Sequence, residues 1–257
     1  MSRLIKVSGL TLGWDETVLL QDASFEVERG SVFVILGGSG CGKSTLLRYL
    51  IGLDQPMSGT IAIEGVSGEQ LGFSRPEFGV MFQSGALLGS MTVGANLALQ
   101  LTEWTQLPAE AVNVIVRAKL RLVGLQDAED KLPSELSGGM KKRAAIARAM
   151  VLEPSLLFLD EPSAGLDPVS SFELDALIRS LNQALGLTVV MVSHELESIF
   201  SIADSCIMLD KASKSIIARG APRTLRDSSA DPRVSAFFNR RAVAPPVAPP
   251  LPLEVKP

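Results

Sequence analysis

Apolar residues along this chain gather in short runs that are separated by amphipathic stretches. The run 32–36 is apolar at every position, as expected of a central parallel strand that is covered on both faces. The run 156–159 has the same character, and 187–192 is apolar except at Thr188 and is predicted to be another buried strand. Helices are predicted over 44–53 and over 168–185, where Gly186 follows. This alternation of strands and helices predicts an α/β fold with a parallel sheet and helices on both faces.

Further elements are predicted in the first sixty residues, in the middle and near the end of the chain. A helix begins at Pro108, carries an apolar stripe from Val112 to Val123 and ends at Gly124. A second middle helix covers 137–152, and its predicted polar face carries Lys141, Lys142, Arg143 and Arg148. Short strands are predicted at 4–7, 23–27, 60–63, 79–82, 205–209 and 215–218.

Composition bounds the class of protein. A length of 257 residues suits one large domain or a domain with appendages. A net charge of −4 and a pI of about 5.2 argue against a nucleic-acid partner, which would require a basic face. Two cysteines cannot build a disulfide framework, and the first residues do not resemble a secretory leader, so a cytoplasmic location is expected.

The mean hydropathy of +0.28 is high for a soluble protein, yet no apolar run approaches the ~20 residues that span a bilayer. The stretch 78–102 contains no charged residue. One interpretation is a buried helix pair, and the other is a surface patch that another protein covers. The sequence alone leaves both open.

Residues 37–44 read G-G-S-G-C-G-K-S, and Thr45 follows. An apolar strand before this segment and a helix after it form the context of a phosphate-binding loop, which argues against a chance glycine-rich turn. Lys43 would reach the β- and γ-phosphates, Ser44 would bind Mg²⁺, and an electropositive setting could lower the pKa of the Cys41 thiol. The predicted phosphate-binding residues are Gly37, Gly38, Ser39, Gly40, Cys41, Gly42, Lys43, Ser44 and Thr45.

Two carboxylates end the strand 156–159. Asp160 is predicted to face the Mg²⁺, and Glu161 is predicted to act as the base that orients the attacking water. An acidic helix cap before Pro162 is the alternative for Glu161. His194, the only histidine, follows the strand 187–192 at the carboxyl edge of the sheet, where ligands bind in open α/β folds. A histidine that only makes structural hydrogen bonds is the alternative.

Residues 136–140 read L-S-G-G-M and open the helix 137–152. Ser137, Gly138 and Gly139 would offer a serine hydroxyl and free N–H groups to a second anion. The phosphate loop, the L-S-G-G element and the apolar strand with Asp160 and Glu161 follow one another in an order that resembles the nucleotide-binding domain of ATP-binding cassette (ABC) proteins.

This resemblance implies the fold and several roles. It implies a P-loop NTPase (RecA-like) core with an antiparallel β subdomain and an inserted helical subdomain, and it implies ATP hydrolysis with Mg²⁺. Gln83 would touch the Mg²⁺ and the water, and His194 would contact the γ-phosphate. Trp14 would stack on adenine, although a surface tryptophan is the alternative. Asp167 belongs to a D-loop-like segment, and the implied Mg²⁺ ligands are Ser44, Gln83 and Asp160.

The resemblance also implies a homodimer in which the L-S-G-G of one subunit closes over the ATP of the other. Met140 departs from the usual glutamine at that position, which should tune binding rather than abolish it. The implied domains are a nucleotide-binding domain over 1–222 with a helical subdomain at roughly 84–155, a C-terminal helical extension over 223–241 that includes a helix at 231–240, and a proline-rich disordered tail over 242–257.

The strings M-F-Q-S-G-A-L-L from Met81, T-Q-L-P from Thr105 and P-S-E-L-S-G-G-M from Pro133 look like the ATPase of Mla-type phospholipid transporters, as does D-P-R-V from Asp231. That likeness implies a membrane permease, an MCE-domain lipid-binding subunit and a place on the cytoplasmic face of the bacterial inner membrane. The permease is expected to dock near Ala86, Leu87, Leu88 and Met91. A regulatory ABC ATPase without transport and the ATPase of a small-solute importer are the alternatives.

Overall fold

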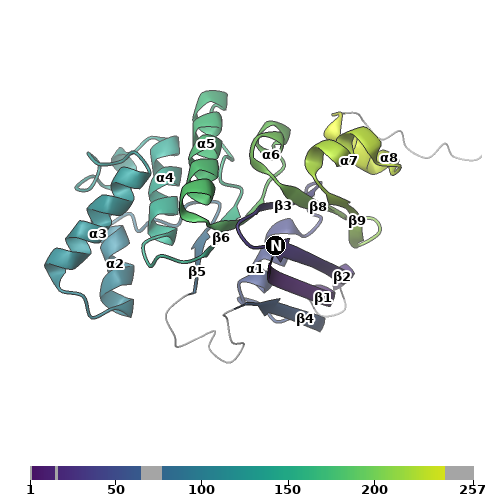
Figure 1. Ribbon diagram of the computed structural model, residues 1–257, viewed down its shortest axis with the longest axis horizontal. Coiled ribbons are helices and arrows are strands. Elements are labelled where there is room, and N and C mark those ends of the chain that lie inside the picture. Colours follow the sequence, from purple (N-terminus) through teal and green to yellow (C-terminus); the bar gives the residue numbers. More distant parts are fainter. Residues whose placement is uncertain (1, 15–16, 65–76, 241–257) are drawn as a thin grey trace, which may run out of the picture.

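The computed structural model describes residues 2–14, 17–64 and 77–240, and its centre is a six-stranded sheet (Figure 1). The first five strands in the spatial order are parallel, and the last pairs antiparallel with its neighbour. This confirms the predicted parallel sheet. The order is β5 (Phe78–Met81), β6 (Leu156–Asp160), β7 (Thr188–Val192), β3 (Val32–Gly37), β8 (Ser205–Asp210) and β9 (Ser215–Gly220).

The apolar run in β3 is buried because both faces of the sheet are covered. Val34 and Leu36 belong to the core on the side of the large helices, whereas Phe33 and Ile35 belong to the core beneath the second sheet. Successive side chains of a strand point to opposite faces. A run without polar residues therefore fills two cores at once.

A second sheet is antiparallel and has the order β2 (Thr17–Glu28), β1 (Arg3–Trp14), β4 (Ser58–Ile63). Helix α1 (Lys43–Leu50) packs with these strands in one core, and the Tyr49 hydroxyl donates to the Gly13 carbonyl at 2.9 Å. The predicted strands 4–7 and 23–27 were too short. Register shifts, as between Val7 and Leu10, interrupt the two-residue alternation and hide the full length of β1 and β2.

The larger helices gather at one end and above the six-stranded sheet (Figure 1). The predicted helix that begins near Pro108 is present with Pro108 as its N-cap, and Gly186 ends α5 with a φ of 66°. The bounds are α2 (Val93–Trp104), α3 (Ala109–Leu122), η1 (Pro133–Glu135), α4 (Gly138–Ala149), α5 (Pro168–Leu185), α6 (Leu196–Ile202), α7 (Pro222–Ser228) and α8 (Pro232–Phe238).

The charge-free stretch 78–102 divides into buried and exposed parts. It forms β5, a connecting loop and α2, whose Leu97 and Leu101 lie in the core. Leu88 in the loop is 45% exposed, and Leu99 on α2 is 44% exposed. The stretch therefore contains one helix rather than a buried helix pair, and it leaves apolar side chains at the surface.

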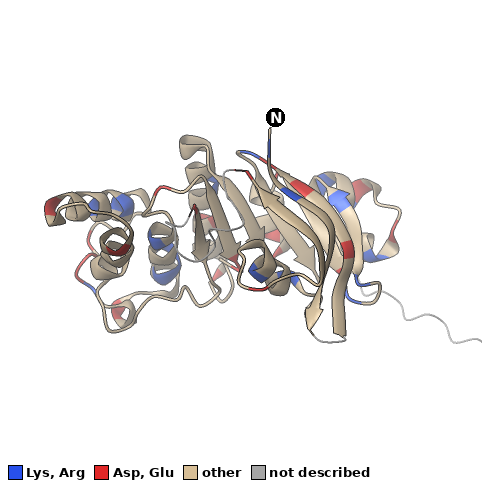
Figure 2. Ribbon diagram, turned by 90° about the horizontal axis from the view of Figure 1, so that it is seen from below, with Lys and Arg blue, Asp and Glu red and all other residues tan. Residues whose placement is uncertain are grey.

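Near the C-terminus, α8 lies within the predicted helix 231–240 and buries Val234 and Phe238 in the core. The predicted tail 242–257 lies outside the described residues, and the domain boundaries remain predictions. In the described part of the chain, no helix is long and apolar enough to cross a bilayer. On the side that Figure 2 shows, basic and acidic residues are intermingled rather than gathered into one basic face.

The close approach of β5 to α4 can be tested at Gly79. A Cβ there would meet the Ala149 carbonyl oxygen and come within 2.7 Å of Leu157 Cδ2. Gly79→Ala should therefore lower the free energy of unfolding by about 1–3 kcal/mol in urea titrations, because overpacking forces the neighbours apart. Gly89→Ala is the control, since a Cβ at Gly89 meets nothing within 4 Å. Equal stabilities of the two variants would contradict this account.

Candidate functional site

The phosphate loop leaves β3 at the carboxyl edge of the parallel sheet and enters α1. Its backbone needs glycine, because Gly37, Gly40 and Gly42 have φ values of 146°, 72° and 96°. The Lys43 ammonium donates to the carbonyls of Gly37 at 3.0 Å and Gly38 at 3.1 Å. The lysine therefore arches back over the loop, and its charge lies beside the space that is expected to hold phosphate.

The side chain of Cys41 turns away from that space. It is 3% exposed and packs in the core beneath the loop, so close to Gly37 that a Cβ at Gly37 would come within 2.5 Å of its sulfur. Burial raises the pKa of the thiol, and the charge of Lys43 opposes this only in part. The sequence left open whether Cys41 is an incidental small residue or a thiol with a lowered pKa; the second is contradicted, because desolvation outweighs the nearby charge.

Ser44 and Asp160 meet beside the loop. The Ser44 hydroxyl donates to Asp160 Oδ1 at 2.9 Å. Burial raises the pKa of Asp160, while the Ser44 hydrogen bond and the charges of Lys43 and Lys142 oppose the rise. No group of three or more His, Cys, Asp or Glu in the described ranges could hold a metal by itself. A hydroxyl and one carboxylate fit Mg²⁺, which commonly takes one or two protein oxygens together with water and substrate phosphates.

Glu161 and His194 form a pair above the ends of β6 and β7. His194 Nδ1 lies 2.7 Å from Glu161 Oε2 and 2.9 Å from Oε1. Glu161 is 9% exposed and has a φ of 48°, which is uncommon for a residue other than glycine, and its N–H donates to the Val192 carbonyl at 3.0 Å. The structure thus places the predicted base in direct contact with His194, the residue expected to contact the γ-phosphate.

Gln83 follows β5 at the same edge of the sheet. Its backbone is held by Lys142, which the sequence placed on the polar face of a helix. The Lys142 ammonium donates to the Gln83 carbonyl at 2.6 Å and to the Glu161 carbonyl at 3.3 Å. Lys142 is 8% exposed, so its assignment to a polar face of the helix was wrong. Burial lowers its pKa, and Glu161, Asp160 and Glu195 oppose this. A single lysine in an amphipathic pattern does not reveal that its ammonium binds backbone carbonyls of distant segments.

The L-S-G-G segment forms the N-terminus of α4. The Ser137 hydroxyl accepts from the Met140 N–H at 3.3 Å, so the serine caps the helix. A Cβ at Gly138 would come within 3.3 Å of Leu166 Cδ2, so this segment lies beside the D-loop-like segment of its own chain. Asp167 there caps α5, because its carboxylate accepts from the N–H groups of Val169 and Ser170. Both candidate residues therefore already serve as caps.

The two candidate anion sites of the chain lie apart. The phosphate loop follows β3, whereas α4 packs against β5, and β6 and β7 separate these strands. At ~4.8 Å per strand, three steps correspond to ~14 Å. Figure 1 shows α1 and α4 separated along the long axis of the molecule. Of the remaining candidates, Ser39 is exposed, Thr45 lies within α1, and Trp14 at the end of β1 is 52% exposed.

Comparison with known proteins identifies the family. The family model described as ABC transporter matches residues 20–164, which is more than half of the chain. The chain belongs to the ABC transporter family. It is thus an ABC ATPase that binds ATP, and the predicted fold is confirmed by solved ABC structures. One is cbiO1 from Clostridium perfringens, part of the ABC transporter complex cbiONQ, with a TM-score of 0.80, 29% identity and coverage of 94% of this chain and 96% of that chain.

Curated relatives cover nearly the whole of this ABC ATPase. It is 41% identical over 250 residues to the intermembrane phospholipid transport system ATP-binding protein MlaF of Escherichia coli (strain K12), covering 95% of this chain and 92% of that protein. It is 40% identical over 250 residues to the probable ribonucleotide transport ATP-binding protein mkl of Mycobacterium leprae (strain TN), covering 95% and 71%.

A dimeric structure of a post-hydrolysis state of the ATP-binding cassette MJ0796 bound to ADP and Pi is also similar to this ABC ATPase. It has a TM-score of 0.74 and 26% identity, and the match covers 85% of this chain and 98% of that chain. The likeness therefore extends to a cassette that has been observed both as a dimer and with the products of ATP hydrolysis.

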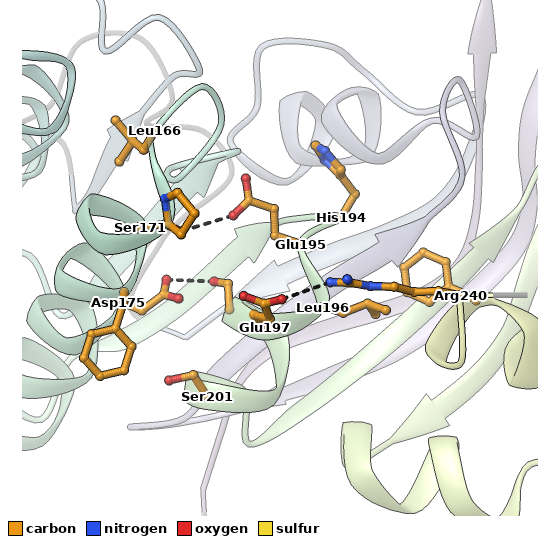
Figure 3. Close-up of a pocket in the computed structure, with 13 residues that line it drawn as sticks. Leu166, Ser171, Asp175, His194, Glu195, Leu196, Glu197, Ser201 and Arg240 are labelled. Carbon is orange, nitrogen blue, oxygen red and sulfur yellow. Dashed lines mark hydrogen bonds and ion pairs between the residues drawn. The ribbon is translucent and has the colours of Figure 1, made fainter.

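A hollow of about 520 Å³ lies beside His194, between α5, α6 and α8 (Figure 3). Two hydrogen bonds join α5 to the segment that follows the histidine. Ser171 donates to Glu195 Oε2 at 3.1 Å, and Ser198 donates to Asp175 Oδ1 at 2.7 Å. These contacts hold α6 and therefore the backbone that carries His194. Sequence reasoning missed them, because serines and acids on separate helices form no local pattern.

The pKa of Asp175 allows the contact between α5 and α6 to be tested by varying the pH. Burial raises its pKa to about 6, although the Ser198 hydrogen bond opposes the rise. Because the folded pKa exceeds the unfolded value, the protein loses stability as the pH rises from ~4 through ~6. Asp175→Asn, which cannot ionise, should raise the free energy of unfolding at pH 7 by on the order of 2–3 kcal/mol, and the difference should vanish near pH 4.

Urea titrations across this pH range measure the effect. Asp167→Asn, at the start of the same helix, is the control. The Ser170 hydroxyl lowers the pKa of Asp167, so that variant should be no more stable than wild type at neutral pH. Parallel pH profiles for wild type and Asp175→Asn would contradict the assignment of an ionised, buried Asp175.

Proposed function

We propose that this ABC ATPase hydrolyses Mg-ATP to power phospholipid transport through a membrane permease. The observation that carries the proposal is the nearly full-length likeness to MlaF, together with the Glu161–His194 pair beside the phosphate loop. Transport of a ribonucleotide is a second candidate, favoured by the similar identity to mkl, which is the longer protein. Purification of the complex from cells and analysis of bound lipids and nucleotides tests which cargo accompanies it.

Each residue at the edge of the sheet has a proposed role. Lys43 and the loop N–H groups bind the β- and γ-phosphates, and Ser44, Asp160 and Gln83 hold the Mg²⁺. Bound Mg²⁺ neutralises phosphate charge. Glu161 accepts the proton of the attacking water, and His194 orients the carboxylate through its Nδ1. Thr45 would contact the α-phosphate and Trp14 the adenine.

We infer that two copies sandwich two ATP molecules. The two candidate anion sites of one chain belong to elements that pack on strands three steps apart in the sheet, ~14 Å, so a single γ-phosphate is not expected to reach both. Ser137, Gly138 and Gly139 of one copy would therefore close over the nucleotide held by the phosphate loop of the other, with Asp167 beside the interface. The dimeric MJ0796 structures are consistent with this arrangement.

We further propose that the permease binds the loop between β5 and α2. Asn96, which is 1% exposed, fixes this loop by accepting from the Leu88 N–H at 2.7 Å and donating to the carbonyls of Leu88 and Met91. Ala86 and Leu88 are nevertheless exposed, and Leu87 and Met91 are half-buried. A rigid loop with exposed apolar side chains suits a short cytoplasmic helix of the permease.

This arrangement would place the chain on the cytoplasmic face of the bacterial inner membrane, attached through its permease. An MCE-domain lipid-binding subunit is the proposed further partner, because the phospholipid cargo must pass to a protein that binds lipid.

Replacement of Glu161 by Gln should stop turnover while ATP binding remains intact. Loss of the base is expected to reduce kcat by about 10²–10⁴-fold, and an ATP-locked dimer should accumulate because closure no longer ends in hydrolysis. ATPase assays and size-exclusion chromatography with ATP measure the two effects. Glu197→Gln, which changes an exposed carboxylate on α6, is the control. A Glu161→Gln protein that turns over at the wild-type rate would remove Glu161 from this role.

Replacement of Leu88 by Glu should break assembly with the permease and leave ATP binding of the separate subunit unchanged. A charge at a desolvated contact cannot find a partner, whereas the same charge on the free surface is solvated. Co-purification with the permease measures assembly. Leu185→Glu is the control, because Leu185 is 49% exposed at the end of α5. Normal co-purification of Leu88→Glu would refute docking at this loop, and unfolding would show that Leu88 is core.

A further inference from the structure

Lys142 joins two backbone segments that carry the proposed chemistry. Its ammonium donates to the carbonyls of Gln83 at 2.6 Å and Glu161 at 3.3 Å. The lysine is 8% exposed and lies in α4, the helix that begins at the L-S-G-G segment. A buried ammonium is costly unless it is well bonded. The burial of Lys142 against two carbonyls of the candidate site therefore requires an explanation.

The strand register explains why these two carbonyls lie within reach of one ammonium. The parallel pairing of β5 with β6 ends at Met81 and Leu159. Gln83 and Glu161 each follow two residues later, where the pairing has stopped and the chains diverge. Lys142 bridges the segments at that point, so it holds them together where the sheet no longer does.

A second cation of α4 binds the same loop further along. Arg148 donates to the Gly85 carbonyl at 3.4 Å and also to the Ala86 carbonyl. Gly85 itself lies close to α4, because a Cβ there would come within 3.4 Å of Ala145 Cβ. The loop that starts at Gln83 is therefore attached along one side of α4, whereas only Lys142 also reaches Glu161.

We propose that Lys142 is a positioning residue for ATP hydrolysis, which holds Gln83 and Glu161 at a fixed separation and ties both to the helix that carries the L-S-G-G segment. This inference rests on the proposed roles of Gln83 and Glu161. The proposal implies that movement of α4 is passed to the hydrolytic residues. When α4 of one copy closes over the nucleotide of its partner, Lys142 carries that displacement to the hydrolytic residues of its own chain.

Steady-state ATPase kinetics of the full-length chain test the proposal. Lys142→Met should lower kcat by about 10–100-fold, because a small misplacement of reacting groups has that effect, while KM for ATP stays within about twofold. Lys142→Arg, which can donate to both carbonyls, should recover most of the rate. Lys119→Met is the matched control, because Lys119 is also 8% exposed but pairs with Glu153.

Three outcomes would overturn the proposal. They are a wild-type kcat in Lys142→Met, an equal loss in Lys119→Met, and a loss of ATP affinity that Lys142→Arg does not restore. Should Lys142→Met fail to fold, Lys142→Leu, which also lacks an N–H donor, is subject to the same criteria.

The Glu161→Gln background separates this inference from the proposed function. If Glu161→Gln alone forms no ATP-locked dimer, the proposed function fails. If Glu161→Gln with Lys142→Met still forms that dimer, while Lys142→Met alone is slow, Lys142 acts on hydrolysis rather than on closure, as proposed. Loss of the dimer only in the double variant would show that Lys142 supports closure itself and would overturn the positioning role.

Discussion

The pairing of β6 with its two parallel neighbours is the constraint on which the candidate site depends. Met81 of β5 lies opposite Leu159, and Asp160 lies opposite Val192 of β7. Parallel strands end at the same edge of a sheet, so this register alone brings Gln83, Glu161 and His194 together from segments far apart in the sequence. A shift of one residue in β6 would turn Asp160 to the opposite face and separate Ser44 from it.

The parts of the fold that could be predicted are those with strong local patterns. The apolar run of β3, the phosphate loop after it and the acidic pair at the end of β6 each stand out within about ten residues. The resemblance carried by the L-S-G-G element placed them in one family. The length of β1 and β2 could not be predicted, because register shifts break the alternation that reveals a strand.

Contacts between side chains of distant segments could not be predicted from the sequence either. Nothing within the helix 137–152 shows that Lys142 is buried while Lys141 beside it is half-exposed. Lys142 is buried because the loop that begins at Gln83 passes across α4. The path of that loop is determined by the assembled sheet and not by the local sequence. The setting of Cys41 has the same origin, since the sequence shows a thiol beside a lysine but not the core into which the thiol turns. In both cases burial outweighs the neighbouring charge.

The N-terminus and the flank of helix α4 have different contacts. Its N-terminus is capped by Ser137, and the helix packs on β5, three strands from the strand that precedes the phosphate loop. Its flank offers Lys142 and Arg148 inward to the loop that begins at Gln83. Buried cations often contribute little to stability compared with apolar residues of similar size. Their presence on this helix is therefore better explained by orientation than by stability, since they hold the loop that begins at Gln83 against the helix that begins at the L-S-G-G segment.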